Sequence, residues 1–184
     1  MTYTNLTRPL LVLMAALFAM TGYADAASKE KIDLRVDRAL SEFRSEIGGA
    51  DAVLERAVGV LVFPRITKGG FGFGGEYGEG ALRVGGKSVA YYSNAAASAG
   101  LQIGLQRRRQ MLVFLDQQAL DRFRASDGWE IGVDASVTVI TVGAGGSIDT
   151  NQLNRPVVAF VFDSKGLMYN LSLEGTKISQ IHND

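Results

Sequence analysis

Two clusters of basic residues are the part of this sequence best suited to binding chemistry. The first cluster accompanies an apolar stripe with helical spacing, and the second is an unbroken run of arginines. A guanidinium group can hold a phosphate through two parallel hydrogen bonds, and an ammonium group attracts it as a point charge. The candidate lipid-binding residues are therefore Lys29, Lys31, Arg35, Arg38, Arg107, Arg108 and Arg109.

Each basic cluster permits a binding role and a purely structural one. The stripe from Ile32 to Ile47, with its basic neighbours, suits a helix lying on an anionic membrane. It equally suits a helix that packs its stripe in the core and leaves its basic edge in water. On a strand, Arg107 and Arg109 share a face that could clamp a phosphate headgroup, or they form a solvated edge that discourages aggregation.

Side chains for nucleophilic or metal-assisted catalysis are nearly absent. The chain has no cysteine, and its one histidine is His182, close to the C-terminus. A histidine-based triad and a histidine-rich metal site therefore cannot be assembled. No calcium-loop pattern or spaced pair of buried carboxylates stands out among the acidic residues. The sequence predicts a protein that is not an enzyme and that uses no metal and no cofactor.

The segment Gly70–Gly75 matches the glycine pattern of dinucleotide-binding loops. That pattern holds a pyrophosphate only where a strand precedes it and a helix begins directly after it. Here the next five residues, Glu76–Gly80, contain two acids and two glycines, which do not begin a helix or attract phosphate. We expect no nucleotide binding, and we interpret the glycines from Gly69 to Gly80 as sites where strands approach one another closely.

The N-terminus has the pattern of a secretory signal peptide. Arg8 is the only charge before an apolar run at Pro9–Met20, and the small residues Ala24-Asp25-Ala26 follow. The run is shorter than the roughly 20 apolar residues that span a bilayer. We therefore predict a signal peptide at residues 1–26 and an exported mature chain, periplasmic or secreted and peripheral to a membrane, with a retained anchor as the alternative. The lack of cysteine excludes a cysteine-linked lipid anchor.

Charge and length limit the possible partners and the number of domains. Lys plus Arg and Asp plus Glu both total 19, so the formal net charge is zero. No global field then draws the protein to nucleic acid, and attraction to an anionic surface must come from local patches. The 184 residues suit a single domain.

Hydrophobic periodicity predicts a few helices and a larger number of strands. Helical spacing at Ile32–Ile47 is closed by Gly48-Gly49, and Gly85-Gly86 predicts a hairpin turn. Period-two alternation predicts a half-buried strand over Trp129–Val139, with a bulge or strand crossing at Val139-Ile140. The remaining predicted elements are helices at Ala50–Ala57 and after Asp116, and strands at Gly59–Phe63 (ending at Pro64), Ser88–Tyr92, Met111–Leu115, Val157–Phe162 and Leu167–Leu173. The fold class is α+β, a single β-rich domain with an antiparallel sheet or barrel-like core.

The sequence resembles the SYLF domain family, which contains eukaryotic lipid-binding and actin-bundling domains and many exported bacterial proteins. The resemblance rests on Lys68–Phe71 with the glycine and aromatic residues up to Gly80, on Gly100–Gly104, on Ser164–Leu167 and on Ser172–Gly175. It implies a single SYLF-like domain at residues 27–184 that binds phosphoinositides or other anionic phospholipids and has no known enzymatic activity.

The resemblance also implies which segment would meet the lipid. In eukaryotic relatives that segment is a basic amphipathic N-terminal one, to which Lys29–Ile47 corresponds by position only. The run Arg107–Arg109 departs from the family pattern. For an exported chain we expect an envelope phospholipid or a host lipid as ligand. The alternatives are an envelope protein-interaction module and, by analogy with the eukaryotic relatives, actin binding.

Overall fold

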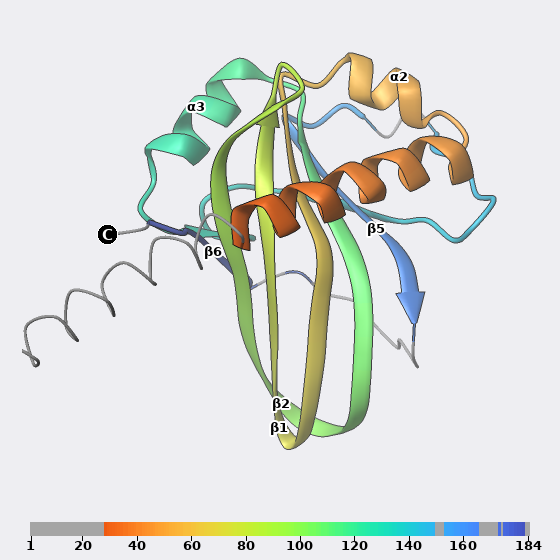
Figure 1. Ribbon diagram of the computed structural model, residues 1–184. Helices are drawn as coiled ribbons and strands as arrows, with labels where there is room; N and C mark the ends of the chain where they lie inside the picture. The colour runs from red at the N-terminus through yellow and green to blue at the C-terminus, as the bar shows by residue number, and fades with distance from the viewer. Residues whose placement is uncertain (1–27, 150–152, 166–172, 174, 183–184) are drawn as a thin grey trace, which may run out of the picture.

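The computed structural model describes residues 28–149, 153–165, 173 and 175–182. Within them, a curled mixed sheet forms a half-barrel, and helices lie across one face and at one end (Figure 1). The predicted α+β class with a β-rich core is confirmed. The predicted signal peptide lies outside the described residues. No described helix is both long enough and apolar enough to cross a membrane.

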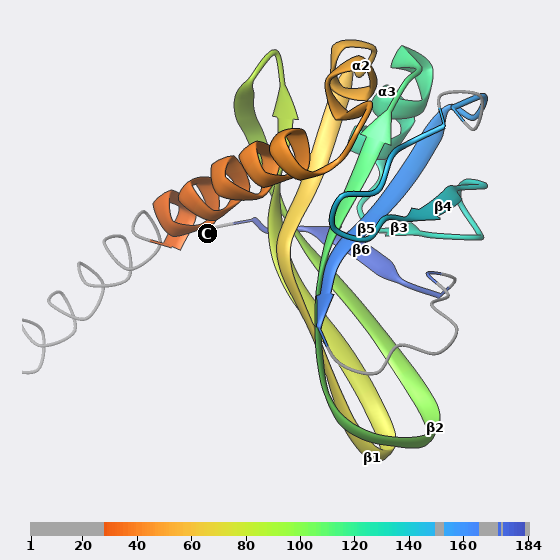
Figure 2. The same ribbon diagram turned by 90° about the vertical axis from the view of Figure 1, so that its right-hand side faces the viewer.

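Two very long strands form the frame of the molecule. β1 (Gly59–Val84) and β2 (Lys87–Phe114) pair antiparallel along their whole length, from Val84 opposite Lys87 to Gly59 opposite Phe114. They are joined at Gly85-Gly86, whose φ values of +57° and +80° suit a tight hairpin turn that favours glycine. Figure 2 shows that both strands turn back at the end of the molecule far from α2 and α3, so the hairpin is folded over into two layers.

Glycines allow the two halves of β1 to pack closely. A Cβ atom on Gly80 would lie 2.1 Å from the backbone oxygen of Val62, and one on Gly78 would lie 2.5 Å from that of Arg65. No other residue type fits at those distances without moving the backbone. The prediction that glycines in this segment allow close approach of strands is confirmed at both positions.

The other strands extend the two layers. β5 (Val157–Lys165) pairs antiparallel with the second half of β2, and β4 (Thr138–Thr141) pairs parallel with β5. β6 (Lys177–Gln180) pairs with the first half of β2 and carries β3 (Trp129–Glu130) on its other edge. The sequence predicted an antiparallel sheet or a barrel-like core. The half-barrel agrees with the second alternative, and the parallel β4–β5 pair makes the sheet mixed instead of purely antiparallel.

Three helices cover the sheet. The N-terminal helix (residues 28–46) crosses one face of the long strands, as Figure 1 shows, and ends before Gly48-Gly49 as predicted. Gly49, with φ of +82°, precedes α2 (Ala50–Glu55). α3 (Gln117–Ala125) begins at Asp116, whose carboxylate accepts a 2.9 Å hydrogen bond from the Ala119 amide, which confirms the predicted cap.

The layer of β1 and β2 beneath the N-terminal helix is buried on both faces. Val60 and Val62 belong to a core that includes the helix, whereas the alternate residues Leu61 and Phe63 belong to the core between the two layers and α3. Phe43 of the helix anchors the first core, with its ring centroid 5.5 Å from that of Phe160 and 5.1 Å from that of Phe162. The helix is thus fixed against the sheet by apolar burial on a continuous face.

The predicted end of a strand at Pro64 is wrong. β1 continues through Pro64, and its pairing with β2 shifts register between Phe63 and Ile66. Proline lacks an amide hydrogen, but at a bulge the ladder does not require one.

The predicted strand over Trp129–Val139 is also wrong. The chain leaves β3 after Glu130, whose amide donates a 2.6 Å hydrogen bond to Asp134, and Gly132 adopts φ of +93°. Val133 is 73% exposed at this turn, so its apolar character does not mark a buried face. β4 runs without a break through Val139-Ile140, where a bulge or crossing was predicted. Of the predicted strand Leu167–Leu173, all but Leu173 lies outside the described residues.

Candidate functional site

The apolar stripe of the N-terminal helix is buried, which decides between the two roles left open by its sequence. Ile32, Val36 and Phe43 are all at most 6% exposed, because the sheet covers this face. The docked helix therefore cannot insert its stripe into a membrane. Its solvent face carries Lys31, Arg35 and Arg38, with Leu34 at 64% exposure among them.

Polar contacts around Asp33 fix the rotation of this helix. The two carboxylate oxygens of Asp33 accept hydrogen bonds from the Ser88 hydroxyl at 2.6 Å and the Tyr91 hydroxyl at 2.8 Å. Arg83 donates to the Asp33 carbonyl oxygen at 3.4 Å and to the Asp37 carboxylate at 2.6 Å. Burial, followed by the bond to Asp33, raises the pKa of Tyr91, so its hydroxyl remains a donor at neutral pH. The side of the helix that carries Asp33 is thereby held against β2.

The first predicted cluster divides between two places. Lys29 lies on the Asp33 flank, with its Nζ atom 5.6 Å from the centroid of the Tyr91 ring. Lys31 is exposed. Arg35 and Arg38 line a cleft of about 250 Å³ beside the second predicted cluster. The two basic clusters, separate in sequence, thus meet at one site.

We call this site the arginine cleft. It lies between the N-terminal helix, the bulge of β1 and the second half of β2. Within the described part of the chain, Asp163 is the only acidic residue in its lining. The lining residues are Arg35, Arg38, Pro64, Arg65, Arg107, Arg108, Arg109 and Asp163.

Arg108 is held by internal partners. Its side chain is 4% exposed and forms two hydrogen bonds with the Glu76 carboxylate, at 2.8 and 2.7 Å, while Glu76 is itself 7% exposed. A third bond, at 3.3 Å, joins Arg108 to Gln110. This buried pair ties the second half of β1 to the second half of β2. Arg108 therefore contributes to the wall of the cleft, and its charge is already neutralised by Glu76.

Arg109 is also paired, with carboxylates from two different elements. It forms an ion pair with Glu42 of the N-terminal helix and another, at 3.4 Å, with Asp163 of β5. Asp163 has φ of +47°, at a point where the pairing of β2 with β5 shifts register. Aspartate tolerates this left-handed conformation better than most residues do. Arg109 thus links the helix to the sheet at the edge of the cleft.

The other four arginines of the cleft retain their charge for a ligand. Among the described residues, none forms a hydrogen bond or ion pair with their side chains, and all four are exposed. They come from three segments distant in sequence and converge on one concavity, a geometry that suits a multiply charged anion. They are Arg35, Arg38, Arg65 and Arg107.

Arg65 is the candidate binding residue that sequence reasoning missed. It stands alone after Pro64, outside either basic cluster, at a position where the strand was predicted to end. The signal that could have found it is the hairpin register. Counting back along both strands from Gly85-Gly86 places Arg65 opposite Gln106, directly before the Arg107–Arg109 run, and the observed register places its neighbour Ile66 opposite Arg108.

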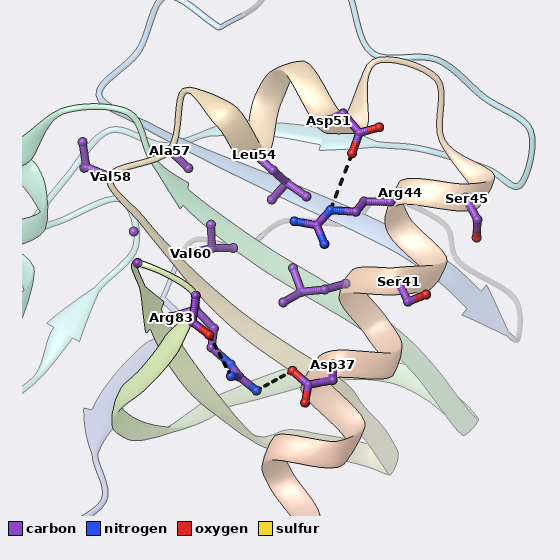
Figure 3. A pocket seen from close by; sticks show the side chains of 14 residues that line it. Asp37, Ser41, Arg44, Ser45, Asp51, Leu54, Ala57, Val58, Val60 and Arg83 are labelled. Atoms are coloured by element: carbon purple, nitrogen blue, oxygen red, sulfur yellow. Dashed lines mark hydrogen bonds and ion pairs between the residues drawn. The ribbon is translucent and has the colours of Figure 1, made fainter.

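A larger cavity, of about 730 Å³, lies on the other flank of the N-terminal helix (Figure 3). Leu54, Val58 and Val60 contribute apolar surface to it. Its two arginines each face an aspartate, Arg44 with Asp51 at 3.5 Å and Arg83 with Asp37 at 2.6 Å. Its cations are therefore already neutralised, and it is a poorer anion site than the arginine cleft.

The described residues contain no group of three or more His, Cys, Asp or Glu side chains that could hold a metal ion.

Comparison with known proteins gives one family. Residues 95–184 match the family described as Ysc84, a Las17-binding protein actin regulator. Among curated proteins, no sequence matches the chain significantly. The matched segment contains the second half of β2, with Arg107–Arg109, and all the later strands. The Ysc84, or SYLF, family is a binding family and not a known enzyme family. Residues 95–184 therefore match the Ysc84 (SYLF) family, in agreement with the resemblance found from the sequence motifs.

Proposed function

We propose that this protein binds anionic phospholipid headgroups at a membrane surface through the arginine cleft, without enzymatic activity. The observation that carries the proposal is the convergence of Arg35, Arg38, Arg65 and Arg107, all exposed and without protein partners among the described residues. A headgroup with more than one negative charge, such as a phosphorylated inositol or a bis-phosphate, matches this multiplicity best. The association of the family with lipid binding supports the same proposal.

Binding in this account is electrostatic and local. The formal net charge of the chain is zero, so the cleft supplies the attraction that the whole molecule lacks. Each Lys or Arg near an anionic bilayer contributes about 1 kcal/mol, an effect that salt screens. Lys31 and Leu34, exposed on the helix next to Arg35, extend the contact surface. The buried stripe of the helix takes no part.

A vesicle titration tests this function. Mature protein is titrated with vesicles of zwitterionic lipid alone and with vesicles containing an anionic phospholipid, each at low and at moderate salt. We expect binding to the anionic vesicles only, weakening as salt rises. Equal binding to both vesicle types, or no binding to either, would contradict the proposal.

A protein-interaction role is the second candidate, favoured by the family description, which names Las17 binding and actin regulation. The same cleft would then receive an acidic protein surface. Affinity for a purified acidic partner or for actin, in a protein that ignores anionic vesicles, would select this candidate.

We also propose that the protein is exported and acts in the periplasm or outside the cell. The support is the sequence of residues 1–26, whose apolar run ends in the small residues Ala24-Asp25-Ala26. N-terminal sequencing of the protein recovered from outside the cytoplasm should give Ala27 as the first residue. Recovery of an intact Met1 would contradict the predicted cleavage.

A further inference from the structure

A second groove, of about 510 Å³, begins where the arginine cleft ends. Arg35, Pro64 and Arg65 line both, so the two concavities share a wall. The second one, which we call the outer groove, is also lined by Ile32, by Thr67 and by the segment Gly75–Glu79 in the second half of β1. The Tyr77 side chain is 53% exposed there.

The chemistry of the lining changes along this path. Among the described residues, the outer groove is lined by no cation other than the two shared arginines. Ile32, Pro64 and the ring of Tyr77 give it an apolar lining. A ligand that follows the groove away from the cleft therefore leaves cationic surroundings for apolar ones.

The outer groove also contains two carboxylates, and both have partners. Glu76 is buried in its ion pair with Arg108. Glu79 accepts a 2.9 Å hydrogen bond from the Tyr77 hydroxyl, whose pKa is raised by burial and by this bond. These acids disfavour an anionic group in the outer groove. The part of a ligand that lies there must be uncharged.

We propose that the cleft and the outer groove are one bipartite site, which holds a single phospholipid molecule with its phosphate among the arginines and one acyl chain along the outer groove. This inference rests on the proposed function and narrows it. A flat bilayer surface would satisfy the arginines alone, whereas a continuous groove of this size also suits a chain that has left the bilayer. The ligand class is thus a phosphate-bearing amphiphile bound as a monomer.

The proposal predicts how affinity depends on acyl length. Full burial of one CH₂ group improves affinity about fourfold. Because the outer groove is open to solvent on one side, we expect roughly a twofold gain per added CH₂ until its length is filled. A headgroup held only by charge shows no such gain.

The test compares glycerol 3-phosphate with lysophosphatidic acids of increasing acyl length, each below its critical micelle concentration. Affinities for mature protein are measured by isothermal titration calorimetry. We expect binding of all these compounds, with affinity that rises with chain length and then levels off. Equal affinity for glycerol 3-phosphate and for every chain length would overturn the bipartite site.

Gly75 offers a way to block the outer groove without changing charge. It lines the groove with ordinary backbone torsion, and a Cβ atom there meets only the Ala96 carbonyl oxygen, at 3.6 Å. The Gly75→Leu variant should therefore fold. It should abolish the increase in affinity with acyl length and leave the affinity for glycerol 3-phosphate unchanged. The matched control is Gly143→Leu, which adds the same side chain in open space, away from the groove, and should behave as wild type. A Gly75→Leu variant that keeps the full chain-length dependence would contradict the proposal.

The outcomes also separate this inference from the function on which it rests. If glycerol 3-phosphate and anionic vesicles bind but acyl length has no effect, the bipartite site is wrong and headgroup binding stands. If neither binds, headgroup binding itself fails, and the bipartite site fails with it. Arg38→Gln/Arg107→Gln should weaken every compound by the same factor, because both arginines line the cleft and neither lines the outer groove.

Discussion

At the scale of single residues, adjacent arginines have different roles that the sequence does not distinguish. Arg107 is exposed and has no hydrogen-bond or ion-pair partner among the described residues, Arg108 is buried against Glu76, and Arg109 links a helix to a strand. Strand alternation explains why Arg108 points inward between two outward neighbours. The inward position can hold an arginine because the Glu76 carboxylate, 32 residues away in sequence, neutralises its charge. Pattern reasoning could place the run on a strand but could not supply this partner.

The buried pair predicts a large stability effect at Glu76. Glu76→Gln leaves the guanidinium of Arg108 buried without its counter-charge and should lower the free energy of unfolding by about 3 kcal/mol. Arg107→Gln, in an exposed position, should change it by less than about 0.5 kcal/mol. Urea denaturation of both variants measures the difference. Similar losses in the two variants would mean that Arg108 and Glu76 are not a buried pair in solution.

At the scale of elements, the folded-over hairpin is what brings the cleft together. The sequence predicted the Gly85-Gly86 turn, the strands on either side and the close approach near Gly80, and the structure confirms all three. It did not predict that β1 continues past Pro64, because proline within a ladder usually marks an end. The error concealed the position of Arg65, and with it the shared wall of cleft and groove.

A matched pair of glycine substitutions tests this packing. Gly80→Ala places a Cβ atom 2.1 Å from the Val62 carbonyl oxygen and should cost at least about 2 kcal/mol of folding free energy. Gly75→Ala meets only an ordinary contact at 3.6 Å and should remain within about 0.5 kcal/mol of wild type. Thermal and urea unfolding report both values. An unaffected Gly80→Ala variant would show that the halves of β1 are farther apart than described.

The attachment of the N-terminal helix gives a second prediction at this scale. Asp33→Ala removes the acceptor for both the Ser88 and Tyr91 hydroxyls, so the helix should loosen on that flank. We expect a loss of about 2 kcal/mol in folding free energy and faster amide hydrogen exchange along residues 28–46. The comparison variant, Asp51→Ala, breaks only the exposed pair with Arg44 and should cost at most about 1 kcal/mol. Unchanged exchange in Asp33→Ala would contradict the assigned role of Asp33.

At the scale of the whole molecule, a chain with no net charge presents one strongly basic concavity. Composition predicts that any electrostatic attraction is local, and the cationic residue types were visible in sequence. Their convergence was not visible, because it depends on a helix packed across a folded hairpin. The apolar stripe of the N-terminal helix has the same residue spacing whether it packs against a membrane or against the sheet. The sequence therefore could not distinguish these two partners.

The measurement that tests the central claim most directly compares two variants with equal charge changes in vesicle binding. Arg35→Gln/Arg65→Gln/Arg107→Gln removes three free cations from the cleft, whereas Arg44→Gln/Arg56→Gln/Arg122→Gln removes three exposed cations that do not line it. At about 1 kcal/mol for each arginine near the bilayer, the cleft variant should lose roughly two decades of affinity for anionic vesicles at low salt. The comparison variant should remain within about threefold of wild type. Equal losses in two folded variants, or no loss in the cleft variant, would contradict binding at the arginine cleft.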